Sequence, residues 1–132
     1  MLVANVVNRN VPTVHAEDDV VSAVGRLLDC RLGVLPVVAE DNRGARVVGL
    51  LRYRDAFAAT YGGAEAAALP VKTAMSPALW TCRTSDSLGI ALRMLRRSDV
   101  DALPVLDGDG YLVGVLSFAD LVRDTARRAA PV

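Results

Sequence analysis

The chain has 132 residues, of which 52% are hydrophobic and 23% charged, a balance that is typical of a soluble globular domain. Its 15 basic and 15 acidic side chains cancel, so no net field attracts nucleic acid or an anionic membrane. No run of about 20 apolar residues is available to span a bilayer, and the N-terminal stretch lacks the order of a signal peptide. We therefore expect a cytoplasmic protein with no nucleic-acid or membrane partner.

The composition also argues against a metal site. Cys30 and Cys82 form no Cys-x-x-Cys pair, and His15 is the only histidine, so a set of zinc ligands cannot be assembled. Two isolated cysteines in a chain without a secretory signal are expected to stay reduced. We expect neither a metal nor a required cofactor.

Residues 1–61 read as one β-α-β-β-α unit. A short extended element around Thr13 precedes an apolar stripe at helical spacing, which follows Asp18. The stretches VLPVVA and VVGLL, separated by a polar turn, are typical of buried strands. A second helix is expected from Arg54 to about Tyr61.

Residues 62–70, with the sequence GGAEAAALP, predict a linker because a glycine pair and a proline punctuate it. Residues 71–132 then repeat the order of the first unit. The repeated elements are an extended segment around Thr81, an apolar stripe after Asp86, strands at ALPVL and LVGVL, and a helix from Phe118 to about Arg128.

The two units are related by an internal repeat. The shift that places Thr13 on Thr81 also places Asp18 on Asp86 and one LPV on the other. The first copy then runs longer, in AEDNRGAR against DGDGY, and we expect a hairpin turn to absorb this difference. One unit is too small to bury a sheet and two helices comfortably. We expect an α/β (α+β) fold in which two β-α-β-β-α repeats pack sheet to sheet with pseudo-twofold symmetry, which leaves two equivalent clefts between the repeats.

The second copy opens with VKTAMSP and closes with ALPVLDGDGYLVGVLSFADLV. In these residues the chain resembles a tandem pair of CBS domains, also called a Bateman module, over roughly residues 3–60 and 71–126. The resemblance implies a regulatory module that binds AMP, ADP, ATP or S-adenosylmethionine and has no catalytic activity. It also implies a homodimer in which four CBS units form a disc.

The resemblance implies a ligand site in the cleft of the second copy. Asp120 would accept hydrogen bonds from ribose hydroxyls, and Ser117 would lie at a helix N-terminus that attracts phosphate. Leu103, Pro104 and Val105 would form an apolar wall for adenine, and the backbone near Thr81 would reach the adenine edge. The full set implied for this site is Thr81, Cys82, Ala102, Leu103, Pro104, Ser117, Phe118 and Asp120.

The same residues have a structural explanation. Ser117 and Asp120 are spaced as a helix capping box, with the serine at the N-cap and the carboxylate at the third helical position. Such a cap contributes about 1 kcal/mol, which accounts for both residues without a ligand. The two roles are compatible. Phe118 likewise either packs in the protein or stacks on a ligand ring.

The first copy predicts a weaker second site because Arg52 replaces the capping serine while Asp55 remains. Arg52 and Arg54 either serve a phosphate or simply face water. In the second copy, Asp101 stands just before the Ala-Leu-Pro stretch and would repel a phosphate there, which favours a ligand whose phosphates turn to solvent. The residues of the weaker site are Thr13, Val14, Leu35, Pro36, Arg52 and Asp55.

Three classes of function follow. The leading hypothesis is a stand-alone regulatory module, of the energy-sensing kind, which binds an adenine-containing ligand and reports to an effector protein or through its own dimer. The alternative is a ligand-free dimeric scaffold with vestigial clefts, its helices before Tyr61 and after Phe118 forming the interface. An enzyme is not expected because the chain has no nucleophile–histidine–acid motif, P-loop or Gly-x-Gly-x-x-Gly.

Overall fold

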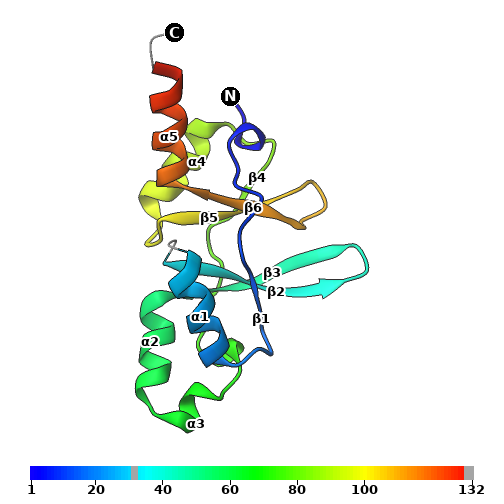
Figure 1. Ribbon diagram of the computed structural model, residues 1–132. Helices are drawn as coiled ribbons and strands as arrows, with labels where there is room; N and C mark the ends of the chain where they lie inside the picture. The colour runs from blue at the N-terminus through cyan, green and yellow to red at the C-terminus, as the bar shows by residue number, and fades with distance from the viewer. Residues whose placement is uncertain (31–32, 130–132) are drawn as a thin grey trace. The chain divides into compact units, whose positions relative to one another are not determined.

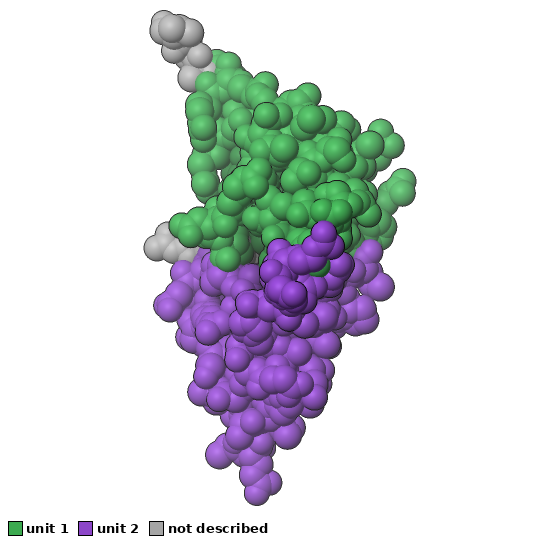
Figure 2. Space-filling view, turned by 90° about the vertical axis from the view of Figure 1, so that its right-hand side faces the viewer, with its two compact units in different colours: residues 1–11, 80–132 green, residues 12–79 purple. Residues whose placement is uncertain are grey.

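The computed structural model describes residues 1–30 and 33–129 and divides the chain into two compact units (Figures 1 and 2). Unit 1 consists of Met1–Val11 and Trp80–Val132, and unit 2 consists of Pro12–Leu79. Each unit therefore contains one β-α-β-β-α repeat together with the leading segment of the other repeat. This exchange of segments differs from the simple division at residues 62–70, and that stretch itself contains a short helix.

Unit 2 contains the elements expected for the first repeat. Its three-stranded sheet has the order β1-β2-β3, with β1 parallel and β3 antiparallel to β2. The elements are β1 (Val14–His15), α1 (Val20–Cys30), β2 (Val34–Asp41), β3 (Gly44–Arg52), α2 (Tyr53–Tyr61), α3 (Ala64–Ala67) and the 3₁₀ turn η2 (Val71–Thr73).

Unit 1 repeats this arrangement (Figure 1). Its sheet has the order β4-β5-β6, again with one parallel and one antiparallel pair. The elements are the 3₁₀ turn η1 (Val3–Asn5), β4 (Cys82–Arg83), α4 (Leu88–Arg97), β5 (Ala102–Leu106), β6 (Leu112–Ser117) and α5 (Phe118–Ala129). The predicted α/β fold with two β-α-β-β-α repeats is confirmed.

Each unit has its own hydrophobic core. Alternate strand residues point towards the helices, and the apolar stripe of one helix packs on them. In unit 2 the core consists of Val14, Ala23, Leu27, Leu35, Val37, Leu51, Ala56 and Val71. In unit 1 it consists of Val3, Cys82, Ala91, Leu95, Leu103, Val105 and Leu116. Val3 and Val71 are both fully buried, so the exchanged segments complete the cores.

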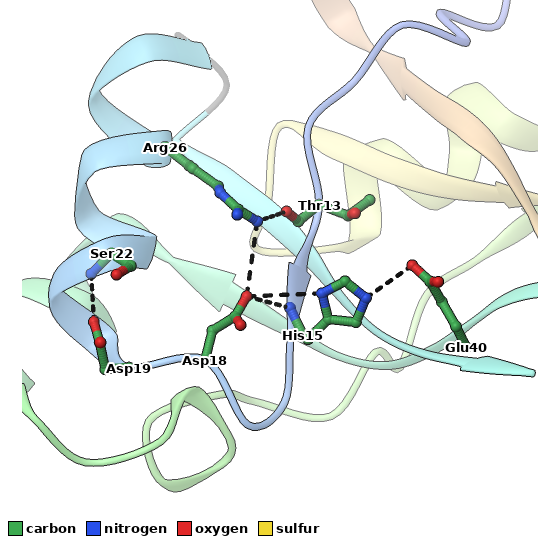
Figure 3. A network of polar contacts seen from close by, with 7 residues as sticks. All are labelled: Thr13, His15, Asp18, Asp19, Ser22, Arg26 and Glu40. Atoms are coloured by element: carbon green, nitrogen blue, oxygen red, sulfur yellow. Dashed lines mark hydrogen bonds and ion pairs between the residues drawn. The ribbon is translucent and has the colours of Figure 1, made fainter.

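The two aspartates that mark the repeat hold turns rather than cap helices. Asp18 Oδ2 accepts the His15 N–H at 2.9 Å (Figure 3), and Asp86 Oδ2 accepts the Arg83 N–H at 2.8 Å. The helix caps lie one residue later in each copy. Asp19 Oδ1 accepts the Ser22 N–H at 2.7 Å, and Ser87 Oγ accepts the Ile90 N–H at 3.3 Å. The backbone and side-chain hydrogen bonds from Ser22 to Asp19 hold the pKa of the Asp19 carboxyl below its usual value.

The length difference between the copies lies in the strands rather than in a turn. In unit 2 the β2–β3 ladder continues through charged residues to the pair Asp41–Gly44, where a tight turn closes it. In unit 1 the ladder ends at Leu106–Leu112, and Asp107 Oδ1 organises the turn by accepting the N–H groups of Asp109 and Tyr111. The expectation of a longer turn was wrong because polar residues also form strands where both faces meet water.

The repeated Val-Gly pair is explained by the exchanged segments. In unit 1, Asn8 and Val115 exchange two backbone hydrogen bonds of 2.9 Å. A side chain at Gly114 would meet the Asn8 backbone, whose carbonyl carbon lies 2.9 Å from the ideal Cβ position. In unit 2, Leu50 and Ser76 exchange two bonds of 2.8 Å, and Gly49 leaves room for Met75. A glycine permits this close approach of backbone to sheet.

Candidate functional site

The start of α5 in unit 1 forms the predicted capping box. The Asp120 N–H donates to Ser117 Oγ at 3.1 Å, and the Ser117 N–H donates to Asp120 Oδ2 at 3.2 Å. The Ser117 hydroxyl also donates to Asp120 Oδ2, at 2.9 Å. Ser117 is only 4% exposed. The serine is therefore a positioning residue that fixes the Asp120 carboxylate.

This arrangement leaves the second carboxylate oxygen of Asp120 for a ligand. Oδ2 already accepts two hydrogen bonds from Ser117. Oδ1 lies 3.8 Å from Arg123 Nη1, beyond hydrogen-bond range, and the Asp120 side chain is 15% exposed. Among the described residues, Oδ1 is thus the oxygen of Asp120 that accepts no hydrogen bond and can accept one from a ribose hydroxyl.

Asp120 opens into a polar groove of about 160 Å³ within unit 1. One wall is the exchanged N-terminal segment and the other is α5. The lining residues are Asn5, Val6, Val7, Asp120, Arg123, Asp124 and Arg127. Of these, sequence reasoning found only Asp120. The spacing of the charged residues along α5 was a usable signal, whereas nothing in the sequence placed the first residues of the chain beside the last helix.

The residues of the predicted adenine wall lie on both faces of the unit 1 sheet. Leu103 and Val105 belong to the core that faces the helices, as does Cys82. Strand alternation places Ala102 and Pro104 on the opposite face, and both are buried. The side chains of Leu103, Val105 and Cys82 are packed in the core, and those of Ala102 and Pro104 are buried on the opposite face. These five residues therefore present no exposed apolar wall.

Of the remaining predicted residues of this site, Thr81 and Phe118 are half-buried and Cys82 is buried. Thr81 is half-buried and immediately precedes β4. Phe118 is half-buried and packs against the core, which favours packing over ring stacking. Burial, helped by the negative charge of Asp86, raises the pKa of the Cys82 thiol to about 12, so the thiol is protonated at neutral pH.

In unit 2 the equivalent carboxylate is already engaged. Arg52 Nε donates to Asp55 Oδ2 at 2.8 Å, and the Ser76 hydroxyl donates to the same oxygen at 3.2 Å. The side chains of Arg52 and Asp55 are each only 23% exposed. The interpretation of Arg52 as a solvated side chain was wrong. The start of α2 has no side-chain cap, and the Asp55 carboxylate is paired with an internal guanidinium where Asp120 has a serine.

The other predicted residues of the weaker site are either hydrogen-bonded within unit 2 or buried. Figure 3 shows Arg26 reaching the Thr13 carbonyl, to which its Nη1 donates at 2.5 Å. Val14 and Leu35 are fully buried in the core, and Pro36 is buried on the other face of β2. Met94 is the counterpart of Arg26 in the second repeat and carries no donor. The backbone near Thr81 therefore meets no such competitor.

Among residues 1–30 and 33–129, no three side chains of histidine, cysteine, aspartate or glutamate gather in a way that would hold a metal ion. Within the same residues, no helix has the length and apolar character needed to cross a membrane.

The CBS domain family model matches residues 3–62 and 71–126. The chain belongs to the CBS domain family. Because the two matches cover most of the chain, the protein contains a tandem CBS pair, and the family is one of regulatory, non-catalytic modules.

Curated relatives are larger proteins. Inosine-5'-monophosphate dehydrogenase of Mycobacterium leprae is 33% identical over 113 residues, which are 85% of this chain and 20% of that enzyme. The CBS pair therefore spans about a fifth of the length of this relative.

Solved structures of similar size share the fold. CBSX2 of Arabidopsis thaliana is 26% identical, with a TM-score of 0.82 and 98% of each chain covered. CBSX2 has also been solved in complex with AMP. The CBS domain pair of protein MJ0100 is 19% identical, with a TM-score of 0.78 and coverage of 97% of this chain and 98% of that one. It was crystallised with 5-methylthioadenosine and S-adenosyl-L-methionine.

Proposed function

We propose that this CBS pair is a regulatory module that binds an adenine-containing ligand such as AMP, ADP or ATP at the Asp120 site. The observation that carries the proposal is the fixing of Asp120, whose Oδ2 is held by Ser117 and whose side chain lines a polar groove. A fixed carboxylate oxygen is a suitable acceptor for a ribose hydroxyl. The AMP complex of CBSX2 supports this ligand class, and S-adenosylmethionine remains a second candidate.

The regulatory part of the proposal concerns the response to the ligand. A ligand shifts a conformational equilibrium only by its differential affinity for the two states. Because the proposed ligand contacts both the exchanged N-terminal segment and α5, its binding would favour the state in which these two are held together. The signal would pass to an effector protein or to a second copy of the chain.

Calorimetric titration of the protein with AMP, ADP, ATP and S-adenosylmethionine tests the proposal. At least one of them should bind, and Asp120→Ala should weaken binding by about tenfold or more, as expected for a lost charge-assisted hydrogen bond. Asp120→Asn keeps an acceptor for Ser117 and should show an intermediate loss. Asp55→Ala should affect binding less. Absence of heat with every ligand at millimolar concentration contradicts the proposal.

A second candidate function, self-association as a scaffold, is favoured by a specific surface of unit 2. Leu28 and Phe57 are 59% and 61% exposed, and they line a shallow groove of about 70 Å³ between α1 and α2 together with Val24 and Tyr53. Contiguous exposed apolar side chains mark interaction surfaces. We therefore also propose a homodimer that uses this face, with light scattering over micromolar concentrations as its measurement.

A further inference from the structure

The groove of unit 1 has a cationic part that a ribose contact at Asp120 does not use. Asp120, Arg123, Asp124 and Arg127 follow the spacing i, i+3, i+4 and i+7, so they share one face of α5. All four line the groove, and Asn5 lines it from the N-terminal segment. From Asp120 to Arg127 the helix advances by about 10 Å.

The charged side chains that line this groove differ in the ion pairs and hydrogen bonds that they already make. Asp124 Oδ2 accepts a hydrogen bond from Arg128 Nε at 3.0 Å, so its charge is compensated from outside the groove. Arg123 lies near Asp120 Oδ1 without bonding to it. Within the part of the chain that the structure describes, Arg127 has neither an ion pair nor a hydrogen bond. The groove therefore offers one unengaged and one loosely engaged guanidinium.

The start of α5 is a poorer place for an anion. The Phe118 N–H already donates to the Asp101 carbonyl at 3.2 Å, and the Asp120 N–H donates to Ser117 Oγ. Two of the first three amides of the helix are thus used within unit 1, and Asp101 carries a negative charge next to them. An anion gains more from the guanidinium groups along the helix face.

We propose that Arg123 and Arg127 bind the phosphate groups of a nucleoside phosphate whose ribose is held by Asp120. The inference rests on the proposed function and adds the direction of the ligand, with its phosphates running along α5 towards solvent. Because the two arginines are one helical turn apart, a diphosphate can engage both, whereas a monophosphate reaches the nearer one. The expected order of affinity is ADP, then AMP, then adenosine.

Calorimetric titrations with adenosine, AMP, ADP and pyrophosphate test this assignment. The wild-type protein should bind ADP about tenfold more tightly than adenosine. Arg127→Gln should weaken ADP binding about three- to tenfold and leave adenosine unchanged, as expected for an exposed ionic contact. Arg123→Gln should also weaken AMP. Arg96→Gln, which removes an exposed arginine of α4, is the matched control and should change neither affinity.

Asp124 provides a test of opposite sign. Its carboxylate lines the same groove and is paired with Arg128. Asp124→Asn removes this negative charge and frees the Arg128 guanidinium, so it should tighten ADP binding and leave adenosine unchanged. This expected gain of affinity separates the phosphate assignment from a general loss of structure.

The outcomes distinguish this inference from the proposed function. Equal affinities for adenosine and ADP, unaffected by Arg127→Gln, overturn the phosphate assignment while the proposed function stands. Binding of pyrophosphate that Arg127→Gln abolishes, without binding of adenosine, supports the anion groove and contradicts an adenine ligand. Absence of binding by all four probes overturns both.

Discussion

At the scale of single residues, the two repeats differ at the equivalent positions 52 and 117, which hold an arginine and a serine. Ser117 holds one oxygen of Asp120, and the Asp120 side chain lines the groove. Arg52 instead donates directly to Asp55, whose acceptor oxygen it shares with Ser76. The same carboxylate at the start of the same helix is therefore a candidate binding group in unit 1 and part of an internal ion pair in unit 2.

Replacing Arg52 with serine should make the Asp55 site of unit 2 resemble the Asp120 site of unit 1. Arg52→Ser removes a partly buried, hydrogen-bonded ion pair in which each side chain is 23% exposed, a loss that costs about 1–3 kcal/mol. The new serine can cap α2, which contributes about 1 kcal/mol in return. We expect the free energy of unfolding to fall by no more than about 2 kcal/mol. Because Arg52 no longer neutralises the Asp55 carboxylate, calorimetry should show two bound AMP molecules per chain instead of one. Arg54→Ser, at an exposed neighbouring position, is the control. A stoichiometry that stays at one in a folded Arg52→Ser protein would show that Arg52 does not close the second site.

At the scale of elements, the sequence predicted most of the secondary structure because local periodicity determines it. The apolar stripes after Asp18 and Asp86 and the short apolar runs became helices and strands close to their expected bounds. The exchange of the N-terminal segments was not predictable in this way. It depends on contacts between residues distant in sequence, such as Val3 with Asp86 and Asn8 with Val115, and the segments have no periodic signal of their own.

The site was only partly predictable for the same reason. Asp120 and Ser117 form a local motif that spacing reveals. The groove beside them combines α5 with residues from the start of the chain, so it could not be assembled from local pattern. The Arg52–Asp55 pair lies within local reach, yet spacing alone does not distinguish an internal ion pair from two solvated side chains.

Gly114 tests the contact between the exchanged segment and β6. In Gly114→Ala the new Cβ would clash with the Asn8 backbone, which cannot rotate away as a side chain does. We expect the free energy of unfolding to fall by about 1–3 kcal/mol, as in other overpacked sites, measured by urea denaturation. Gly108→Ala is the matched control because nothing lies within 4 Å of its Cβ position, and its effect should stay within about 0.5 kcal/mol. Equal stability of the two variants would mean that the segment is not held against β6.

At the scale of the whole molecule, the exchange of segments means that a repeat and a folding unit are different stretches of chain. The repeat recognised by the family model begins at residue 71, but the core of unit 1 also needs Val3. The same unit pairs its β6 strand with Asn8. A second repeat expressed without the first residues of the chain therefore lacks a buried core side chain and a row of backbone hydrogen bonds.

This dependence predicts which fragment of the protein folds. Residues 80–132 alone should be largely unfolded, because loss of a fully buried side chain and its surroundings costs several kcal/mol, about half the stability of a small domain. Residues 1–11 joined to residues 80–132 by a flexible linker should fold cooperatively, since closing a longer loop adds only about 0.6 kcal/mol per doubling of its length. Circular dichroism during thermal melting measures both.

Val3→Asp in the fusion should return it to the behaviour of the isolated fragment, because the charge would be buried without a partner. A cooperative melt of residues 80–132 alone, as stable as that of the fusion, would show that unit 1 does not need the exchanged segment.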